Sequence, residues 1–169
     1  MLTTEQENFL QTLPDDPIKV SPLDPNTHKI AGGLIAQIKN AFPELEILYT
    51  GASALKIAGK NDIDISVLDQ IENFDKNLPK FIEILGPPLK IGRRNIRWEF
   101  NKDGYDIDIY LTDKNSPQIK EQKKTFELLR DNPSILEEYR KLKENAHGLK
   151  RHEYQKRKYE FYNRILGID

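Results

Sequence analysis

The stretch GASALKIAGKNDIDISV, residues 51–67, joins a glycine-containing loop to the start of an alternating strand. Successive side chains of a β-strand point to opposite faces, so Asp62 and Asp64 share one face and the isoleucines after them share the other. The aliphatic face is typical of a buried sheet surface, and the aspartate face follows directly on the loop that begins at Gly51. The segment therefore predicts a sheet domain with carboxylates on one side of a strand.

A second alternating segment, YDIDIYLTD at residues 105–113, follows NIRWEFN, and the Asp-Gly pair between them is a strong hairpin signal. Asp106 and Asp108 share one face of this strand. A turn over residues 101–104 would set Arg97 opposite Asp108, whereas a two-residue turn at 103–104 shifts the partners and keeps both faces. If this strand lies beside 62–69, four carboxylates meet on one surface.

Four carboxylates in one place are unfavourable unless a cation neutralises them, and hard oxygen ligands select Mg²⁺ or Mn²⁺. We expect Asp62 and Asp64 to be metal ligands and catalytic residues, with Asp108 or Asp106 as a third ligand. Metal ions held in this way clamp the attacking and leaving oxygens of a nucleotidyl transfer. The alternative, an amphipathic strand with one solvated face, stays open for each Asp-x-Asp pair.

The loop before Asp62 carries groups that suit phosphate. Gly51 lets the backbone approach a ligand closely, and the Ser53 hydroxyl together with the charges of Lys56 and Lys60 could contact phosphate oxygens. Arg97 is the best placed of three nearby arginines, because strand parity sets it on the aspartate face. These five residues form the predicted binding site for a nucleoside triphosphate.

The rest of the chain predicts an α+β fold, in which a mixed sheet is flanked by helices and followed by a helical C-terminal section. Helices are expected at about 26–42, 77–86, 115–131, 133–146 and 149–166. We treat residues 1–169 as one domain, with an N-terminal extension and core over 1–113 and the helical section over 114–169, packed back on the sheet. Five residues of that section are either core contacts or the lining of a nucleotide pocket: Tyr139, Lys143, Tyr154, Lys158 and Tyr162.

Composition narrows the possible functions. The chain has a net charge of −1 and no cysteine, which excludes disulfides and thiolate metal sites and predicts no DNA partner. Residues 1–113 carry a net charge of −6 and residues 114–169 a net charge of +5, a division that suits either phosphate binding or simple solvation. No apolar run is long enough to cross a membrane and the first residues resemble no secretory signal, so we expect no membrane partner and a cytoplasmic location.

The segment at 51–67 resembles the signature of polymerase-β-type nucleotidyltransferases, a Gly-Ser loop followed by hydrophobic-Asp-hydrophobic-Asp. With FELLRDNPSILEEYRKLKENAH and EYQKRKYEFYNRIL after it, the chain is similar to the GrpB family from about Leu45 to Leu166. The resemblance implies that Asp64 is the aspartate that GrpB proteins usually keep, and that Asp62 fills the first metal position of active nucleotidyltransferases. Two positions depart from these patterns: Asp-x-Asp at 106–108 replaces a His-x-His that is typical of GrpB proteins, and Ala52 stands where the superfamily usually has serine.

Two functions follow as hypotheses. The first is a Mg²⁺-dependent nucleotidyltransferase that moves a nucleotide from a nucleoside triphosphate to a hydroxyl of a small molecule, a protein or an RNA. The second is a catalytically inactive binding or regulatory module on the same fold, which Ala52 favours. The carboxylates favour the first hypothesis, because a degenerate domain has little reason to keep four aspartates on one cleft.

Overall fold

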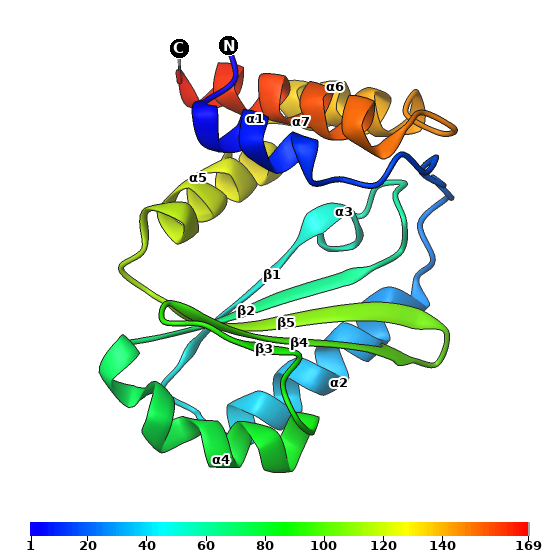
Figure 1. Cartoon of the computed structure of the whole chain (residues 1–169). Helices are drawn as coiled ribbons and strands as arrows, with labels where there is room; N and C mark the ends of the chain where they lie inside the picture. The colour runs from blue at the N-terminus through cyan, green and yellow to red at the C-terminus, as the bar shows by residue number, and fades with distance from the viewer. Residues whose placement is uncertain (169) are drawn as a thin grey trace.

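The computed structural model describes residues 1–168, and its centre is a five-stranded mixed sheet in the order β1-β2-β5-β4-β3 (Figure 1). The strands are β1 (Glu46–Thr50), β2 (Ile63–Asp69), β3 (Lys90–Ile91), β4 (Asn95–Lys102) and β5 (Tyr105–Asp113). β2 and β5 run parallel, and the other neighbouring pairs are antiparallel. The predicted α+β class is confirmed.

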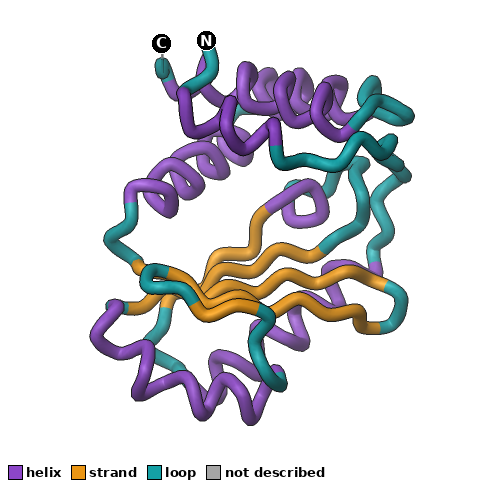
Figure 2. Tube along the Cα trace, in the orientation of Figure 1, coloured by secondary structure: helices purple, strands orange, loops and turns teal. Residues whose placement is uncertain are grey.

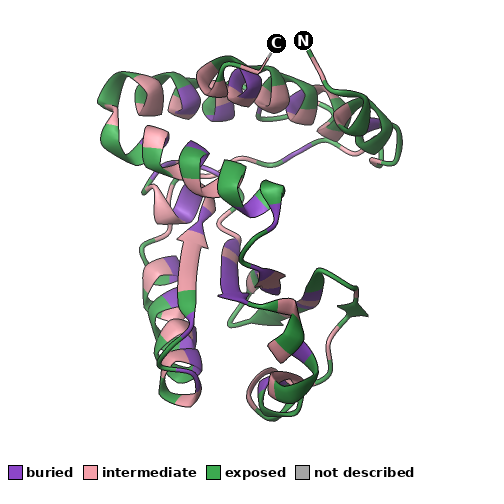
Figure 3. Cartoon of the chain, turned by 90° about the vertical axis from the view of Figure 1, so that its left-hand side faces the viewer, coloured by how far each residue is buried: buried purple, intermediate pink, exposed green. Residues whose placement is uncertain are grey.

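Two helices, α2 (Asn26–Ala41) and α4 (Phe74–Leu85), cover one face of the sheet (Figures 1 and 2). The aliphatic sides of β2 and β5, which include Ile63, Ile65, Ile107 and Ile109, are fully buried against them. The alternating apolar residues of the strands and the apolar residues at helical spacing in α2 therefore pack in one core. Figure 3 colours the buried parts of the chain purple.

The opposite face of the sheet looks toward a second group of helices, α5 (Pro117–Asp131), α6 (Pro133–Glu144) and α7 (Arg151–Leu166). They agree with the three predicted C-terminal helices. They pack on the short helix α3 (Gly51–Ala54) and its loop through a cluster that contains Ala52, Ile57, Leu129, Tyr139 and Phe161. The helical section is thus fixed to the end of β1 and encloses a cavity with the aspartate face of the sheet.

The N-terminal segment belongs to this helical layer. Its helix α1 (Thr4–Gln11), which the sequence analysis did not predict, packs against α7, and Thr3 caps it with a complete capping box. The lead-in after it runs beside the start of α7, where Asp16 binds Arg151 at 2.6 Å. Both ends of the described chain consequently lie in the upper layer of Figure 1.

The β4–β5 hairpin uses the shorter of the two turns considered above. Asp103 and Gly104 have φ of 55° and 88°, which is the backbone of a two-residue turn, and Lys102 pairs with Tyr105. Glu99 therefore faces Asp108, and Arg97 faces Tyr110. The apolar and polar faces of the hairpin remain as predicted.

A short 3-10 turn, Ile71–Asn73, precedes α4 and completes the elements of the described chain. Among residues 1–168, no helix combines the length and the apolar character that crossing a membrane requires.

Candidate active site

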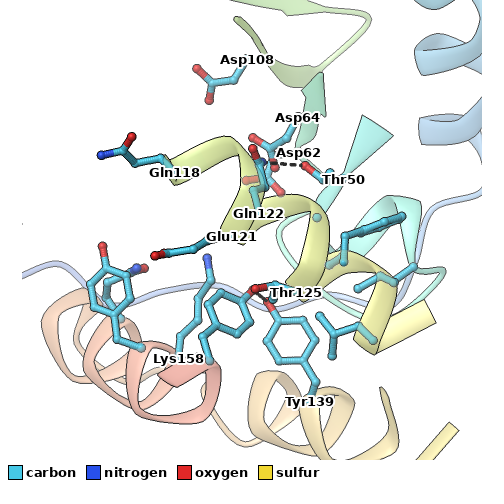
Figure 4. Close-up of a pocket in the computed structure, with 18 of the residues that line it drawn as sticks. Thr50, Asp62, Asp64, Asp108, Gln118, Glu121, Gln122, Thr125, Tyr139 and Lys158 are labelled. Carbon is cyan, nitrogen blue, oxygen red and sulfur yellow. Dashed lines mark hydrogen bonds between the residues drawn. The ribbon is translucent and has the colours of Figure 1, made fainter. Parts of the chain in front are cut away.

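The parallel pairing of β2 and β5 brings two of the predicted aspartates together. Asp64 and Asp108 are direct partners in the register, and both side chains leave the sheet on the face opposite the buried isoleucines. Asp62 precedes β2 on the same side, and all three line one cavity. Figure 4 shows Asp108, Asp64 and Asp62 at one side of this cavity.

The cavity has a volume of about 650 Å³ and lies between the sheet and the helical layer. The sheet side contributes Thr50, Ser66, Tyr110 and Thr112 beside the aspartates. The helical side contributes residues of α1, α5, α6 and α7. One hydrogen bond of 3.2 Å joins the two sides, from the Gln122 side chain of α5 to the Thr50 hydroxyl at the end of β1. This volume is in the range of pockets that hold small-molecule ligands.

Gly51 makes the closest approach to the carboxylates. Its φ is +86°, and a β-carbon at this position would lie 2.8 Å from the Oδ2 atom of Asp64. Both the backbone conformation and the space therefore require glycine. The loop that the sequence analysis assigned to ligand binding thus packs directly on Asp64.

The three carboxylates differ in their partners. Asp62 forms an ion pair with Lys60 at 2.7 Å, and Asp108 forms one with Arg97 at 2.7 Å. Asp64 has no ion-pair partner or side-chain hydrogen bond within residues 1–168. Since Asp62 and Asp108 turn toward these cations, no group of three acidic, histidine or cysteine side chains in the described chain converges on one metal position.

Burial raises the pKa of Asp64 to about 6, and the neighbouring Asp62 and Asp108 carboxylates act in the same direction. Burial also acts to raise the pKa of Asp62, but Lys60 outweighs it, so the pKa of Asp62 is lowered. The two adjacent aspartates are therefore unequal. Asp62 keeps its charge at neutral pH. Asp64 lacks a cation of its own, so a bound cation would lower its pKa most.

Five tyrosines and lysines of α6 and α7 were predicted to be either core contacts or the lining of a nucleotide pocket. All five line the cavity opposite the aspartates: Tyr139, Lys143, Tyr154, Lys158 and Tyr162. Lys143 donates a hydrogen bond to the Tyr154 hydroxyl at 2.9 Å, and the hydroxyls of Tyr139 and Tyr162 lie 2.7 Å apart. Lys158 lies over the Tyr162 ring, 5.6 Å from its centre. Tyr139, Lys143 and Tyr154 are also buried, so core packing and cavity lining coincide in these residues.

The opposite wall carries three cationic residues, Lys143, Arg151 and Lys158, and one carboxylate, Glu121 of α5 (Figure 4). Contacts with Tyr162, against the effect of burial, raise the pKa of Lys158, and Tyr154 and Asp64 add to this rise. Burial acts to raise the pKa of Tyr154, but Lys158 and Lys143 outweigh it, and the pKa is lowered. Neither lysine has a carboxylate partner within 4 Å in the described chain, so two ammonium groups face the cavity opposite the aspartates.

Four predicted site residues lie outside the cavity lining: Ser53, Lys56, Arg97 and Asp106. The Ser53 side chain is buried and donates its hydrogen bond to the Asp62 carbonyl at 2.8 Å, so this hydroxyl fixes the loop. Lys56 is exposed with φ of 59°, and Asp106 is exposed and accepts a hydrogen bond from Asn101. The structure unites Gly51, Lys60, Asp62, Asp64 and Asp108 at the cavity, with Arg97 held on Asp108.

The chain resembles several solved structures at low identity. It is 17% identical to Cid1, an RNA terminal uridylyl transferase, with a TM-score of 0.48 over 78% of this chain and 44% of Cid1. It is 19% identical to a chain of the GLD-2/RNP-8 complex, with a TM-score of 0.44 over 83% of this chain and 60% of that one. The chain thus spans less than half the length of Cid1, and no functional conclusion rests on these likenesses.

The chain matches no curated protein. The model of the GrpB protein family matches residues 17–167, which is nearly the whole chain and includes every cavity residue except those of the N-terminal segment. The resemblance that the loop, the strand and the helical tail indicate is confirmed, and the chain belongs to the GrpB family.

Proposed function

We propose that the chain is a nucleotidyltransferase that binds a nucleoside triphosphate in the cavity and transfers its nucleotide to an acceptor hydroxyl. The observation that carries this proposal is the register of Asp64 with Asp108 on neighbouring parallel strands, at a cavity whose far wall presents two lysines. Carboxylates on one wall and ammonium groups on the other suit a ligand that carries both a bound cation and phosphates.

The donor set fits a divalent cation. The available ligands are carboxylates without thiolate or imidazole, and Asp64 is half-buried, unpaired among the described residues and raised in pKa. Asp62, Asp64 and Asp108 would hold Mg²⁺ or Mn²⁺, the first and last after leaving Lys60 and Arg97. When bound, such an ion supplies positive charge to the phosphates and lowers the cost of placing them beside the carboxylates.

The chain's own cations are arranged to bind the phosphates. Lys143 and Lys158 extend from α6 and α7 toward the cavity, and Lys60 would be free for phosphate once Asp62 has another partner. Gly51 packs on Asp64 and fixes the carboxylate at the edge of this phosphate region. The predicted roles of Ser53 and Lys56 are not needed for this binding mode.

The transfer itself requires an in-line displacement. The acceptor oxygen bonds to the α-phosphorus while the bond from that phosphorus to the leaving pyrophosphate breaks, and the acceptor proton passes to a carboxylate. Asp108 is the residue proposed to take this proton once it has left Arg97, two nitrogens of which contact its Oδ1 atom at 2.7 and 2.9 Å in the structure. In this proposal the acceptor hydroxyl belongs to a small molecule, a protein or an RNA. We also propose that the protein is located in the cytoplasm.

A thermal-shift screen of the four nucleoside triphosphates, each with and without Mg²⁺, tests the proposal. A ligand at about 100 times its dissociation constant stabilises the fold by about 2.7 kcal/mol. For a domain of this size that corresponds to a rise of roughly 5–10 °C in the unfolding temperature. We expect such a rise with at least one nucleotide and only when Mg²⁺ is present. No rise with any of them would contradict the proposal.

The second candidate is a non-catalytic nucleotide-binding or regulatory module of the same family. It is favoured by one observation, that Asp62 and Asp108 are each neutralised by a residue of the chain and no three acidic groups converge among residues 1–168. Such a module would bind the nucleotide equally well with Mg²⁺ or with a chelator. The same screen therefore separates the two functions.

A further inference from the structure

The N-terminal helix lines the cavity although it lies outside the part of the chain that the family shares. The family match begins at residue 17, whereas Gln6, Phe9 and Leu13 all belong to the cavity lining. These residues precede the matched region and lie where they would touch a bound ligand.

Helix α1 is held at this position by hydrogen bonds. The side-chain amides of Gln6 and Asn163 form two reciprocal hydrogen bonds of 2.9 and 2.8 Å, and Asn163 also donates to the Met1 carbonyl at 2.7 Å. Asn163 is only 2% exposed, so these bonds are shielded from water. Helix α1 is therefore a built part of the cavity wall.

Phe9 is not explained by packing alone. Its side chain is 46% exposed, and of the five exposed large apolar residues in the described chain it is the one that lines the cavity. Its ring meets the ring of Tyr159 edge to face, with centres 6.3 Å apart, and Tyr159 lines the cavity too. Two aromatic side chains, one from α1 and one from α7, thus meet at the cavity and leave one ring partly exposed.

The position and polarity of this aromatic pair indicate what it binds. Phe9 and Tyr159 line the same cavity as Lys158, which is proposed to contact phosphate, so a nucleotide held at Lys158 shares its cavity with this pair. Gln155, one turn earlier on α7, also lines the cavity and makes no side-chain hydrogen bond within residues 1–168. An amide offers both a donor and an acceptor, as the edges of nucleobases do.

We propose that Phe9 and Tyr159 form the nucleobase subsite, in which the base packs on the aromatic pair and Gln155 contacts its polar edge. This inference rests on the proposed function, since it identifies where one part of the nucleoside triphosphate binds. It assigns base recognition to α1 and α7, and leaves the phosphates to the lysines and the carboxylate end of the sheet.

The test compares the affinities of Mg²⁺-nucleotide and Mg²⁺-tripolyphosphate by isothermal titration calorimetry. Tripolyphosphate has the three phosphates of the nucleotide but neither its ribose nor its base. In the wild type, the best nucleotide of the four should bind more tightly than tripolyphosphate. Phe9→Ala should weaken nucleotide binding roughly fivefold to a hundredfold, the range of base–aromatic stacking, and leave tripolyphosphate binding unchanged. Phe9→Trp should retain nucleotide affinity.

Leu89→Ala is the matched control, because Leu89 is an exposed apolar residue, 62% exposed, that does not line the cavity. It should change neither affinity. If Phe9→Ala lowers both affinities equally, or neither, the nucleobase subsite is refuted while polyphosphate binding by the cavity stands. If the wild type binds neither ligand, the proposed function fails as well.

Discussion

Gly51 and Asp64 restrict each other at the centre of the candidate site. The glycine has a left-handed backbone, and the Asp64 carboxylate occupies the space of its missing side chain. Sequence reasoning assigned Gly51 to the close approach of a phosphate. The residue it approaches is instead Asp64, which is 13 positions later in the chain and comes near only because β1 and β2 pair, with Thr50 opposite Asp64.

Replacing Gly51 tests this contact. We expect Gly51→Ala to lower the free energy of unfolding by about 1–3 kcal/mol, from backbone strain and displacement of Asp64. Gly33→Ala is the control, because Gly33 lies inside α2 with open space at its β-carbon position. This substitution should raise the free energy of unfolding by about 0.5–1 kcal/mol, since alanine favours the helix more than glycine does. Urea unfolding measures both, and equal effects of the two substitutions would contradict the account.

The raised pKa of Asp64 predicts a pH dependence of stability. The folded chain keeps the Asp64 proton up to pH of about 6, whereas the unfolded chain loses it near 4. The folded state therefore binds more protons in this interval, and its stability falls as pH rises from about 4 to 6 and stays lowered above it. The contribution is at most on the order of 3 kcal/mol.

Asp64→Asn removes this contribution with almost no change in side-chain shape. Without divalent cations, the variant should be more stable than the wild type at pH 7.5 and should lose the advantage toward pH 4. Urea unfolding at several pH values, in the presence of a chelator, measures the difference. A difference that does not change with pH would show that the Asp64 carboxyl is not the titrating group.

Among the elements, the strands and the long helices could be predicted because their patterns are local. Alternation identified β2 and β5, and Asn132-Pro133 marked the start of α6. The pairing of Arg97 could not be predicted from parity alone, because it depends on the turn length. Arg97 still reaches Asp108 from the neighbouring pair, since its side chain is long enough to cross diagonally.

Helix α7 shows where the sequence left alternatives open. Tyr154, Lys158 and Tyr162 recur at four-residue spacing, which marks one helix face and does not distinguish a core face from a cavity face. What distinguishes them is the surface opposite, here the aspartate side of the sheet. Helix α1 escaped prediction because its polar sequence has little apolar periodicity, and its position depends on contacts with α7.

The docking of α1 on α7 can be tested through Asn163. We expect Asn163→Ala to lower the free energy of unfolding by about 1–3 kcal/mol, because it removes the hydrogen bonds of this buried side chain to Gln6 and to the Met1 carbonyl. Hydrogen exchange of residues 1–12 should become faster, while exchange in β2 and β5 stays slow. Gln155→Ala, on the same helix, should change neither quantity beyond about 0.5 kcal/mol. Unchanged exchange of α1 in the Asn163 variant would contradict this docking.

At the scale of the whole molecule, the cavity is assembled from parts that lie far apart in the sequence. The acidic wall comes from residues 60–64 and 108, and the basic wall comes from residues 143–158. The opposite net charges of the two segments were visible in the sequence, but the facing arrangement depends on how α5 carries the chain from the sheet to the helical layer (Figure 1). Three aspartates of the first segment and three basic residues of the second thus line the same cavity.

The central claim, that Asp64 and its neighbours bind a metal–nucleotide complex, is tested most directly by calorimetric titration of the best-binding nucleotide with and without Mg²⁺. Asp106→Asn is the matched control for Asp64→Asn, because Asp106 is an exposed aspartate outside the cavity. The account predicts that the wild type and Asp106→Asn bind with equal, Mg²⁺-dependent affinity and that Asp64→Asn loses the Mg²⁺ dependence. Binding by the wild type that ignores Mg²⁺, or an Asp64→Asn variant that retains the dependence, would contradict it.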